Sequence, residues 1–362
     1  MCGIIGYSGP KEPLPILIGG LSRLEYRGYD SAGVAILDGE KLTIEKKEGK
    51  LQVLKDHLED KKIIGNIGIG HTRWATHGIP NNINAHPHSD NQKEFAIIHN
   101  GIIENYAEMK DDLLKKNFIF ESDTDTEVVA VELGNQWSGR LLETVTNVAK
   151  KLDGTYALVV TSTKEPGTIV AGRMMSPLVL GVGEGETFLA SDSAAILEHT
   201  NKMIFLENGD FVEITNGTFK LFDINMNEIS REIQEIDWKV SEAEKSGYDH
   251  FMYKEILEQA EVIERTISGR LEIGSEEIPI DLNKAKEFEK IWIVACGTAY
   301  HAGLFGKDLF EKVLGVPVSV ELASEFRYRE PIVGENDLGI VISQSGETMD
   351  TIAATELLKE NG

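Results

Sequence analysis

Up to about residue 225, the hydrophobic positions fall mostly in short runs rich in Val, Ile, Tyr and Thr, bounded by Gly, Asp and Asn. Such runs predict β-strands, here at residues 2–8, 31–37, 42–47, 67–75, 95–99, 155–161, 168–171, 187–190 and 204–206. Two stretches with helical spacing interrupt the strands, residues 102–116 and 126–152, and the second is broken near Gly139. Strands in long meanders with segregated helices favour an α+β sandwich over alternating βαβ units.

The pattern changes beyond about residue 237. Apolar positions at helical spacing among many charges predict a connecting helix up to about residue 270, and a polar loop follows it. Strict β-α-β alternation comes next, with apolar strands predicted at residues 291–295, 318–322 and 338–343. Apolar strands joined by helices predict a buried parallel sheet.

These changes of pattern divide the chain into three parts. We predict one domain at residues 1–225, a helical connector at 226–286 and an α/β domain at 287–362. Doubly wound sheets commonly have about five strands or more, and only three are predicted here. We therefore expect the α/β domain to be incomplete and the chain to be the first part of a longer protein.

Charge and cysteine content narrow the possible functions. The 362 residues carry 60 acidic and 36 basic side chains, a net charge of -24 that disfavours binding to nucleic acid or to an anionic membrane surface. No run of about 18 apolar residues predicts a membrane span, and no basic segment at the start predicts a secretion signal. Two cysteines cannot form a disulfide framework, so a reducing cytoplasm is the expected location.

Cys2 is the strongest candidate for chemistry. Because Cys2 is small, Met1 can be removed, which would leave an α-amine with a pKa of about 7.7–8.0 beside a thiol with a pKa of about 8.5. This pair is a nucleophile with a built-in base, as used by N-terminal-nucleophile hydrolases. From position alone, a cysteine that happens to begin a strand is the more favoured reading.

Three other segments carry matching chemistry. Arg73, in Gly-His-Thr-Arg-Trp-Ala-Thr-His-Gly at residues 70–78, has a guanidinium whose fork fits a carboxylate. Asn100 and Gly101 follow a strand and offer an amide and a backbone N–H, the components of an oxyanion hole. The segment Ser-Asp-Thr-Asp-Thr-Glu at residues 122–127 opens a helix, where N-capping by either aspartate is the ordinary reading.

Taken together, these segments resemble the class II glutamine amidotransferases. The ordered matches are Cys2-Gly3-Ile4-Ile5-Gly6, Arg27-Gly28-Tyr29-Asp30-Ser31-Ala32-Gly33, residues 71–78, His99-Asn100-Gly101 and residues 123–127. The resemblance implies an αββα N-terminal-nucleophile sandwich in which Cys2 attacks the glutamine amide and Asn100 and Gly101 hold the oxyanion. It also implies that Arg73 binds the α-carboxylate of glutamine and that Asp125 binds its α-ammonium. Thr76 and His77 would line the glutamine pocket, and Trp74 would lie at the exit for ammonia. Arg27 would brace the site without reacting.

The second half has a phosphate-binding pattern. Hydroxyl and amide groups follow two predicted parallel strands, at the positive ends of the next helices, although by themselves such residues are more often simple N-caps. The segment Ser-Gln-Ser-Gly-Glu-Thr at residues 343–348 resembles the phosphate motif of SIS sugar-isomerase domains. The resemblance implies sugar-phosphate contacts from Thr298, Ser343, Gln344, Ser345 and Thr348. Ala299 departs from it, because relatives often have Ser there.

The combined resemblance, which runs to residue 362, implies an enzyme that hydrolyses L-glutamine and uses the ammonia to convert D-fructose 6-phosphate to D-glucosamine 6-phosphate. It implies no cofactor, a homodimer in the full-length form and, for an incomplete chain, glutaminase activity alone. Two alternatives stay open: an amidotransferase of the phosphoribosyl-pyrophosphate type, and a non-catalytic sugar-phosphate-binding fragment. Five of nine histidines lie between residues 71 and 99, but none has HExxH spacing, so no metal site is predicted.

Overall fold

The computed structural model describes residues 2–75, 77–236, 248, 250–267, 287–344, 346 and 348–361. The chain divides into two compact units, Met1–Phe251 and Met252–Gly362. None of the helices in these described ranges is long and apolar enough to cross a bilayer.

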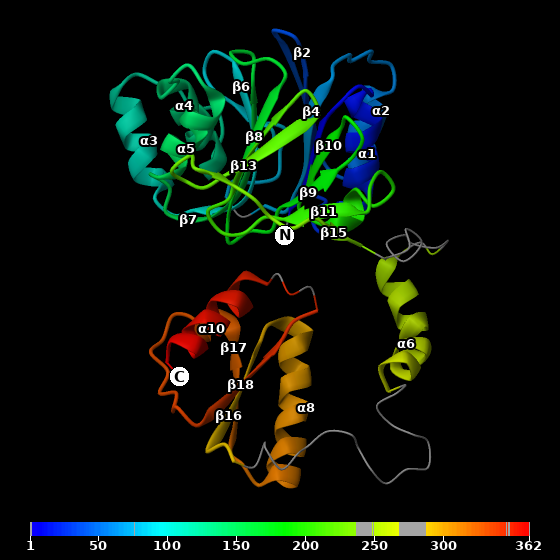
Figure 1. The fold of residues 1–362 in the computed structure, drawn as a ribbon, viewed down its shortest axis with the longest axis vertical. Helices are drawn as coiled ribbons and strands as arrows, with labels where there is room; N and C mark the ends of the chain where they lie inside the picture. Colours follow the sequence, from blue (N-terminus) through cyan, green and yellow to red (C-terminus); the bar gives the residue numbers. More distant parts are fainter. Residues whose placement is uncertain are drawn as a thin grey trace. The chain divides into compact units, whose positions relative to one another are not determined.

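Two antiparallel sheets form the centre of the first unit (Figure 1). The eight-stranded sheet has the order β15-β11-β9-β10-β1-β4-β2-β3. Its strands are β1 (Gly3–Ser8), β2 (Ser31–Asp38), β3 (Lys41–Glu48), β4 (Ile67–Arg73), β9 (Val179–Val182), β10 (Thr187–Ala190), β11 (Lys202–Phe205) and β15 (Gln234–Glu235). The seven-stranded sheet has the order β14-β13-β12-β8-β7-β6-β5. Its strands are β5 (His88–Ser89), β6 (Phe95–Ile103), β7 (Gly154–Ser162), β8 (Thr168–Met174), β12 (Phe211–Thr215), β13 (Thr218–Phe222) and β14 (Glu228–Ile229).

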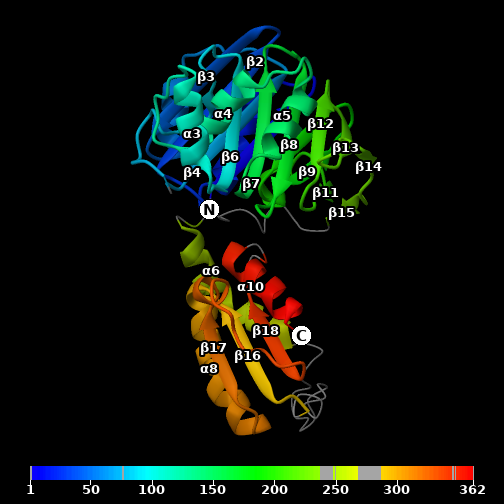
Figure 2. The same ribbon diagram turned by 90° about the vertical axis from the view of Figure 1, so that its left-hand side faces the viewer.

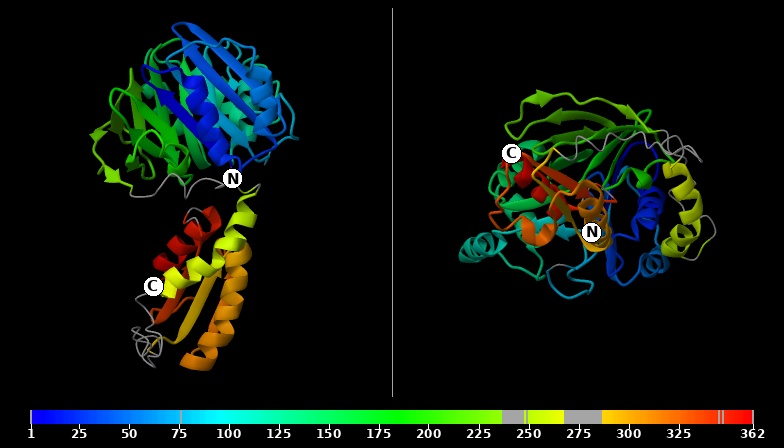
Figure 3. Two further views of the ribbon diagram at one scale, coloured as in Figure 1. Left: turned by 90° about the vertical axis from the view of Figure 1, so that its right-hand side faces the viewer. Right: turned by 90° about the horizontal axis from the view of Figure 1, so that it is seen from below.

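Helices cover the outer face of each sheet. The helices α1 (Pro13–Leu24) and α2 (Leu51–Leu58) share an apolar core with the eight-stranded sheet, and Figure 3 shows α1 in dark blue on that sheet. The helices α4 (Asp125–Asn135) and α5 (Leu141–Ala149) share another with the seven-stranded sheet, while α3 (Tyr106–Lys115) packs on α4 (Figure 2). A third apolar cluster fills the space between the sheets. The αββα sandwich expected from the sequence is therefore confirmed.

The helices α1 and α2 correct the sequence analysis, which found only two helical stretches here. Pro13, Pro15, Gly19 and Gly20 hide the helical spacing in α1. A Cβ on Gly20 would lie 2.8 Å from Ile5 Cδ1, so this glycine allows α1 to approach β1 closely. The second stretch, predicted at residues 126–152, is two helices, and Gly139 lies between them with a φ of +98° that an α-helix does not allow.

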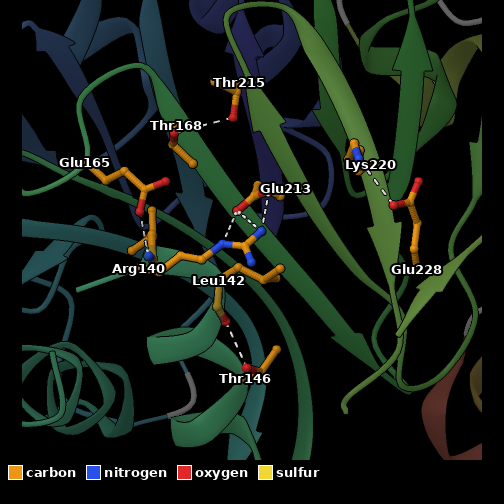
Figure 4. A network of polar contacts seen from close by, with 10 residues as sticks. Arg140, Leu142, Thr146, Glu165, Thr168, Glu213, Thr215, Lys220 and Glu228 are labelled. Carbon is orange, nitrogen blue, oxygen red and sulfur yellow. Dashed lines mark hydrogen bonds and ion pairs between the residues drawn. The ribbon is translucent and has the colours of Figure 1, made fainter. Parts of the chain in front are cut away.

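A polar network attaches α5 to the seven-stranded sheet. Arg140, which precedes α5, donates to both carboxylate oxygens of Glu213 on β12 at 2.9–3.2 Å (Figure 4). The backbone N–H of Leu141 donates to Glu165 at 2.7 Å, and the Thr146 hydroxyl donates to the Leu142 carbonyl within the helix at 2.9 Å. Bidentate geometry makes the Arg140–Glu213 pair more specific than an ordinary surface ion pair.

The first unit extends past the boundary that the sequence analysis placed at residue 225. β14 pairs with β13, and β15 pairs with β11, so residues 228–235 belong to the two sheets and not to a connector. Strands of two residues carry no readable alternation of apolar and polar positions, which is why the sequence did not reveal them. About half of the predicted connector, chiefly residues 237–247 and 268–286, lies outside the described residues.

The second unit contains α6 (Phe251–Ile267) and a three-stranded parallel sheet of order β17-β16-β18. Its strands are β16 (Lys290–Ala295), β17 (Val318–Leu322) and β18 (Asp337–Ile342). Trp292 and Val294 of β16 face α9 (Ala323–Phe326) and α10 (Met349–Glu360), whereas Ile291 and Ile293 face α8 (Gly297–Leu314). The predicted parallel β-α-β unit is confirmed.

Candidate functional site

Both sheets of the first unit contribute to the candidate site. Cys2 directly precedes β1, and its Sγ accepts a hydrogen bond from the backbone N–H of Trp74 at 3.2 Å. The Sγ also lies 3.6 Å from the carbonyl oxygen of Trp74. Asn100, on β6 of the other sheet, donates from Nδ2 to the carbonyl oxygen of Cys2 at 3.0 Å. The structure thus brings Cys2, Trp74 and Asn100 together, although they are up to 98 residues apart in sequence.

The environment of Cys2 favours the neutral thiol. Burial raises the pKa of the Cys2 thiol above its ordinary value, and the hydrogen bond from Trp74 opposes that rise only in part. A thiol in this state needs a nearby base before it can act as a nucleophile.

Gly101 follows Asn100 in a conformation that only glycine adopts easily. Its φ is +133°, and a Cβ there would lie 2.0 Å from the Thr155 carbonyl oxygen on β7. Substitution is therefore blocked by both the backbone angle and the neighbouring strand. The local sequence Asn-Gly places an amide side chain beside a backbone that cannot carry a bulkier residue.

Arg73, at the end of β4, is 3% exposed. Its Nη2 donates to the carbonyl oxygens of His77 and Gly78, the latter at 3.2 Å. Its Nη1 is buried and has no hydrogen-bond partner among the residues that the structure describes. A guanidinium nitrogen is too strongly polar to stay unpaired in the interior without cost, so this nitrogen is suited to an anionic ligand.

Asp30 connects this arginine loop to β2. The backbone N–H of Asp30 donates to the Arg73 carbonyl at 3.1 Å, and its carboxylate accepts from the N–H of Ala75. A Cβ on Gly28 would lie 2.7 Å from the carbonyl carbon of Arg73, so the chain at Gly28 lies directly against the loop. The sequence analysis assigned Asp30 no role of its own.

Asp125 begins α4 but does not cap it. Thr124 is the N-cap, and its hydroxyl accepts from the Glu127 N–H at 3.3 Å, which corrects the reading of either neighbouring aspartate as the cap. The Asp125 carboxylate instead accepts from the Ile103 N–H at 2.9 Å and is 5% exposed. The helix can therefore present Asp125 to a ligand.

The other predicted glutamine-binding residues differ in setting. The His77 ring packs edge-to-face on Tyr106 at 5.2 Å, and its Nδ1 is buried with no partner in the described part of the chain. The Trp74 side chain is half exposed and meets the Tyr29 ring at 5.3 Å. Thr76 lies outside the described residues.

Arg27 is anchored at Asp192. It donates to the Asp192 carboxylate at 2.6 Å, and Tyr26 donates to the same carboxylate at 2.9 Å. Ser191, next to Asp192, accepts from the backbone N–H of Ile4 through its hydroxyl at 3.0 Å. Arg27 therefore braces the start of β1.

The sequence analysis also missed the part that His71 plays. His71 is fully buried on β4, and its Nε2 lies 3.0 Å from Asn100 Oδ1 and 3.0 Å from the His99 carbonyl oxygen. Strand alternation carries the signal, because His71 shares a face of β4 with Ile69, which belongs to the core between the sheets. A polar residue on that face must reach the opposite sheet.

The predicted phosphate-binding residues lie at one edge of the parallel sheet. Ala295 and Ile342 pair across β16 and β18, so the segments that follow them start side by side. The Ser343 hydroxyl accepts from the Gly346 N–H at 3.0 Å, and this glycine has a φ of +69°. Thr348 is the N-cap of α10 and makes no side-chain capping bond. Thr298 and Gln344 are exposed, whereas Ser345 lies outside the described residues.

Within the described ranges, no group of three or more His, Cys, Asp or Glu side chains is arranged to hold a metal ion. Three of the five histidines between residues 71 and 99 instead pack ring against ring. The rings of His71 and His86 are 4.2 Å apart, and those of His86 and His88 are 4.7 Å apart.

The fold and this set of residues place the chain in a known class. It belongs to the glutamine amidotransferase domain family, whose model matches residues 55–246, and an SIS domain model matches residues 283–362. Its relatives include the glutamine–fructose-6-phosphate aminotransferases [isomerizing] of Clostridium tetani, 49% identical over 366 aligned positions, and of Clostridium acetobutylicum, 48% identical. In both comparisons all of this chain aligns, and it spans 60% of the relative's length.

Solved structures confirm the fold class. The glutamine phosphoribosylpyrophosphate amidotransferase of B. subtilis, complexed with ADP and GMP, matches 88% of this chain and 65% of that one at a TM-score of 0.56 and 23% identity. A structure described as the allosteric regulatory enzyme of purine biosynthesis matches 95% of this chain and 69% of that one, at a TM-score of 0.57 and 24% identity. At these identities the likeness concerns the fold alone.

Proposed function

We propose that this chain hydrolyses L-glutamine at Cys2 and that the ammonia serves to convert D-fructose 6-phosphate to D-glucosamine 6-phosphate. One observation carries the proposal: the Asn100 amide and the Cys2 backbone are hydrogen bonded across the two sheets, in a chain whose relatives are named for this reaction. Because the chain spans 60% of those relatives, the complete synthesis is proposed for the protein that contains all their parts.

The glutaminase step follows from the chemistry of the site. Removal of Met1 frees the α-amine of Cys2, which takes the thiol proton as Sγ attacks the side-chain amide carbon of glutamine. The oxyanion that forms is stabilised by Asn100 Nδ2 and the Gly101 N–H. The protonated amine gives its proton to the leaving nitrogen, and ammonia departs. Water then hydrolyses the thioester to L-glutamate and restores the thiol.

Recognition of glutamine is assigned to the charged residues beside the nucleophile. The free Nη1 of Arg73 is available for the α-carboxylate, and the buried Asp125 carboxylate is available for the α-ammonium. We place His77 and Thr76 along the same loop as lining residues and Trp74 at its exposed edge, where ammonia would leave.

The sugar phosphate is assigned to the strand ends of the second unit. Ala295 and Ile342 end paired parallel strands, so the segments that follow them begin at the carboxyl edge of the sheet, where hydroxyls and helix N-termini favour a phosphate monoester. This proposal includes Thr298, Ser343, Gln344, Ser345 and Thr348. The match to the SIS domain model favours fructose 6-phosphate over phosphoribosyl pyrophosphate as the substrate. The solved phosphoribosylpyrophosphate amidotransferase is similar to this chain in fold alone.

The experiment is a glutaminase assay with the full chain and with Cys2→Ala and Cys2→Ser. We expect intact mass to show loss of Met1, and both variants to lose ammonia release, since an alcohol is a far weaker nucleophile than a thiol. Cys296→Ala, at the other cysteine, is the matched control and should retain full activity. Undiminished hydrolysis by Cys2→Ala would contradict the mechanism.

The sugar-phosphate assignment needs a separate measurement. Calorimetric titration with fructose 6-phosphate should give binding that weakens in Ser343→Ala, whereas glutaminase activity should be unaffected. Equal binding by both proteins would place the phosphate elsewhere. The homodimer and the cytoplasmic location remain predictions.

A further inference from the structure

The amide of Asn100 is held from both sides. Its Nδ2 donates to the carbonyl oxygen of Cys2, and its Oδ1 faces Nε2 of His71, each at 3.0 Å. The oxygen and nitrogen of an asparagine amide are nearly identical in shape, so only their partners determine which end faces which way. An oxyanion donor is useful only if its NH₂ end is directed at the nucleophile.

The protonation of His71 settles the orientation. Its Nε2 is also 3.0 Å from the His99 carbonyl oxygen, which can only accept a hydrogen bond. His71 Nε2 must therefore carry the proton, and the atom of Asn100 that faces it must be the oxygen. Burial lowers the pKa of His71 to about 3, so the ring stays neutral and Nδ1 is the unprotonated nitrogen.

The surroundings fix the ring of His71. It lies on β4 between Ile4 of β1 and Gly33 of β2, on an interior strand of the eight-stranded sheet. The His86 ring packs against it at 4.2 Å. A Cβ on Gly33 would lie 2.2 Å from the His86 carbonyl oxygen, so this glycine allows the His86 backbone to approach the sheet. His71 therefore has little freedom to turn its Nε2 away from Asn100.

We propose that His71 is a positioning residue for glutamine hydrolysis, whose Nε2–H holds the Asn100 amide with its NH₂ end towards Cys2. This inference rests on the proposed function, because it assigns the cause of the orientation that the oxyanion hole requires. His71 does not touch the substrate and transfers no proton. Its contribution is made entirely through Asn100.

A purely structural role is the alternative, in which His71 only links β4 to β6. Loss of such a link would lower stability and would reduce activity independently of Asn100. A positioning role instead makes the two residues non-additive, because an Asn100→Ala protein has no amide left to orient.

The test is a double-mutant cycle of His71→Phe and Asn100→Ala, measured as kcat and KM for glutamine hydrolysis by the full chain. His71→Phe should lower kcat by about 10- to 100-fold and change KM by less than about threefold, while Asn100→Ala should lower kcat by about 10²- to 10³-fold. The double variant should match Asn100→Ala within about twofold. Multiplied effects, or an unchanged kcat in His71→Phe, would overturn the proposal.

Two further variants keep the test decisive if His71→Phe does not fold. Gln at position 71 can place an N–H near the position of Nε2, whereas Asn is shorter and cannot. We therefore expect His71→Gln to retain a kcat at least about fivefold above that of His71→Asn. Equal kcat values would overturn the proposal. His199→Phe, at a histidine that stacks on Phe188 elsewhere in the unit, is the matched control.

A spectroscopic measurement is independent of activity. In protein labelled with ¹⁵N-histidine, the signals that disappear in His71→Gln should be those of a neutral imidazole protonated at Nε2, unchanged between pH 5 and 8. An Nδ1–H tautomer would overturn the inference even in an active enzyme. If the wild-type chain has this tautomer but does not hydrolyse glutamine, the proposed function fails while the hydrogen-bond assignment stands.

Discussion

At the scale of the single residue, the two terminal nitrogens of Arg73 lie in different settings. One of its nitrogens, Nη2, anchors the loop by binding the carbonyl oxygens of His77 and Gly78. The other terminal nitrogen, Nη1, is buried and has no partner among the described residues. Because a guanidinium is a fork, one side chain can shape the loop and still present a donor to a substrate carboxylate.

Substitution of Arg73 should therefore act on substrate binding. Arg73→Ala removes one side of a desolvated charge pair, which costs about 2–5 kcal/mol, so KM for glutamine should rise by at least about 30-fold. Arg73→Lys keeps the charge but not the fork, and we expect a smaller rise in KM. Steady-state kinetics measure both, with Arg140→Lys in the exposed pair with Glu213 as control. A loss confined to kcat would exclude a carboxylate-binding role.

The sequence could predict residues such as Cys2, Arg73 and Asn100 because each stands in a short segment with recognisable chemistry. It did not predict the contacts of His71 or Asp30. Their partners, Asn100 and Ala75, lie 29 and 45 positions away in the sequence, and only the folding of the strands brings them into contact.

At the scale of the element, the positive φ of Gly101 in β6 lies directly against the neighbouring strand. The φ of Gly101 is +133°, and its missing Cβ faces the Thr155 carbonyl oxygen on β7. Gly139 also has a positive φ, +98°, but has nothing within 4 Å of a Cβ position. A substitution at Gly139 would therefore cause backbone strain alone, whereas one at Gly101 would cause both strain and a collision with β7.

Gly101→Ala should consequently destabilise the first unit more than Gly139→Ala does. Strain at a positive φ costs about 1–3 kcal/mol at either position, and at Gly101 the displacement of β7 adds to it. Urea denaturation gives the two free energies of unfolding. Equal losses in the two variants would show that β6 and β7 can separate there without cost.

Several buried histidines lie close to one another in the first unit. Burial holds the pKa of His86 well below its ordinary value, and the nearby His71, His88, His99 and Arg73 add to this effect. Neither ring nitrogen of His86 has a hydrogen-bond partner among the described residues. An unfolded histidine takes up a proton near pH 6.5, whereas the buried one does not. The unfolded state therefore binds more protons below this pH, and the free energy of unfolding falls as the pH falls.

Replacing His86 should make that pH dependence shallower. Each buried neutral histidine contributes a slope of about 1.4 kcal/mol per pH unit below about pH 6.5. His86→Phe removes one such contribution without loss of a hydrogen bond to the described residues. Urea denaturation at pH 7, 6 and 5 measures the slope, with His301→Phe, an exposed position in the second unit, as control. A slope equal to that of the wild type would mean that His86 is protonated in the folded state.

At the scale of the whole molecule, the sequence predicted the sheets and their packing better than the short strands at the sheet edges and the helix α1. Long apolar strands and the β-α-β alternation gave the sandwich and the parallel sheet, because burial on one or both faces imposes a readable period. The helix α1 was missed because its prolines and glycines disguise a helix whose stability comes from packing on β1. The strands β14 and β15 were missed because two residues show no period.

The end of the first unit determines where the chain can be shortened without loss of the proposed glutaminase activity. Asp210 is 2% exposed, and both of its carboxylate oxygens accept from Arg231, at 2.8 and 2.9 Å. Arg231 lies between β14 and β15, beyond the boundary at residue 225 that the sequence predicts. A chain that ends at residue 225 therefore loses two strands and leaves a buried carboxylate without its cation.

We expect a chain of residues 1–236 to hydrolyse glutamine with the kcat and KM of the full chain, because every described residue of the glutamine site lies within it. A chain of residues 1–225 should have a lower free energy of unfolding than the longer one. Loss of the Arg231 ion pair should account for about 1–3 kcal/mol, a value kept low because Arg231 is partly exposed. Loss of the β14 and β15 strand pairs should lower the free energy of unfolding further. Urea denaturation of the two fragments measures this difference, and Arg231→Gln in the longer one isolates the ion-pair contribution. Equal stability of the two fragments would return the boundary to residue 225 and show that β14 and β15 only rest on the sandwich.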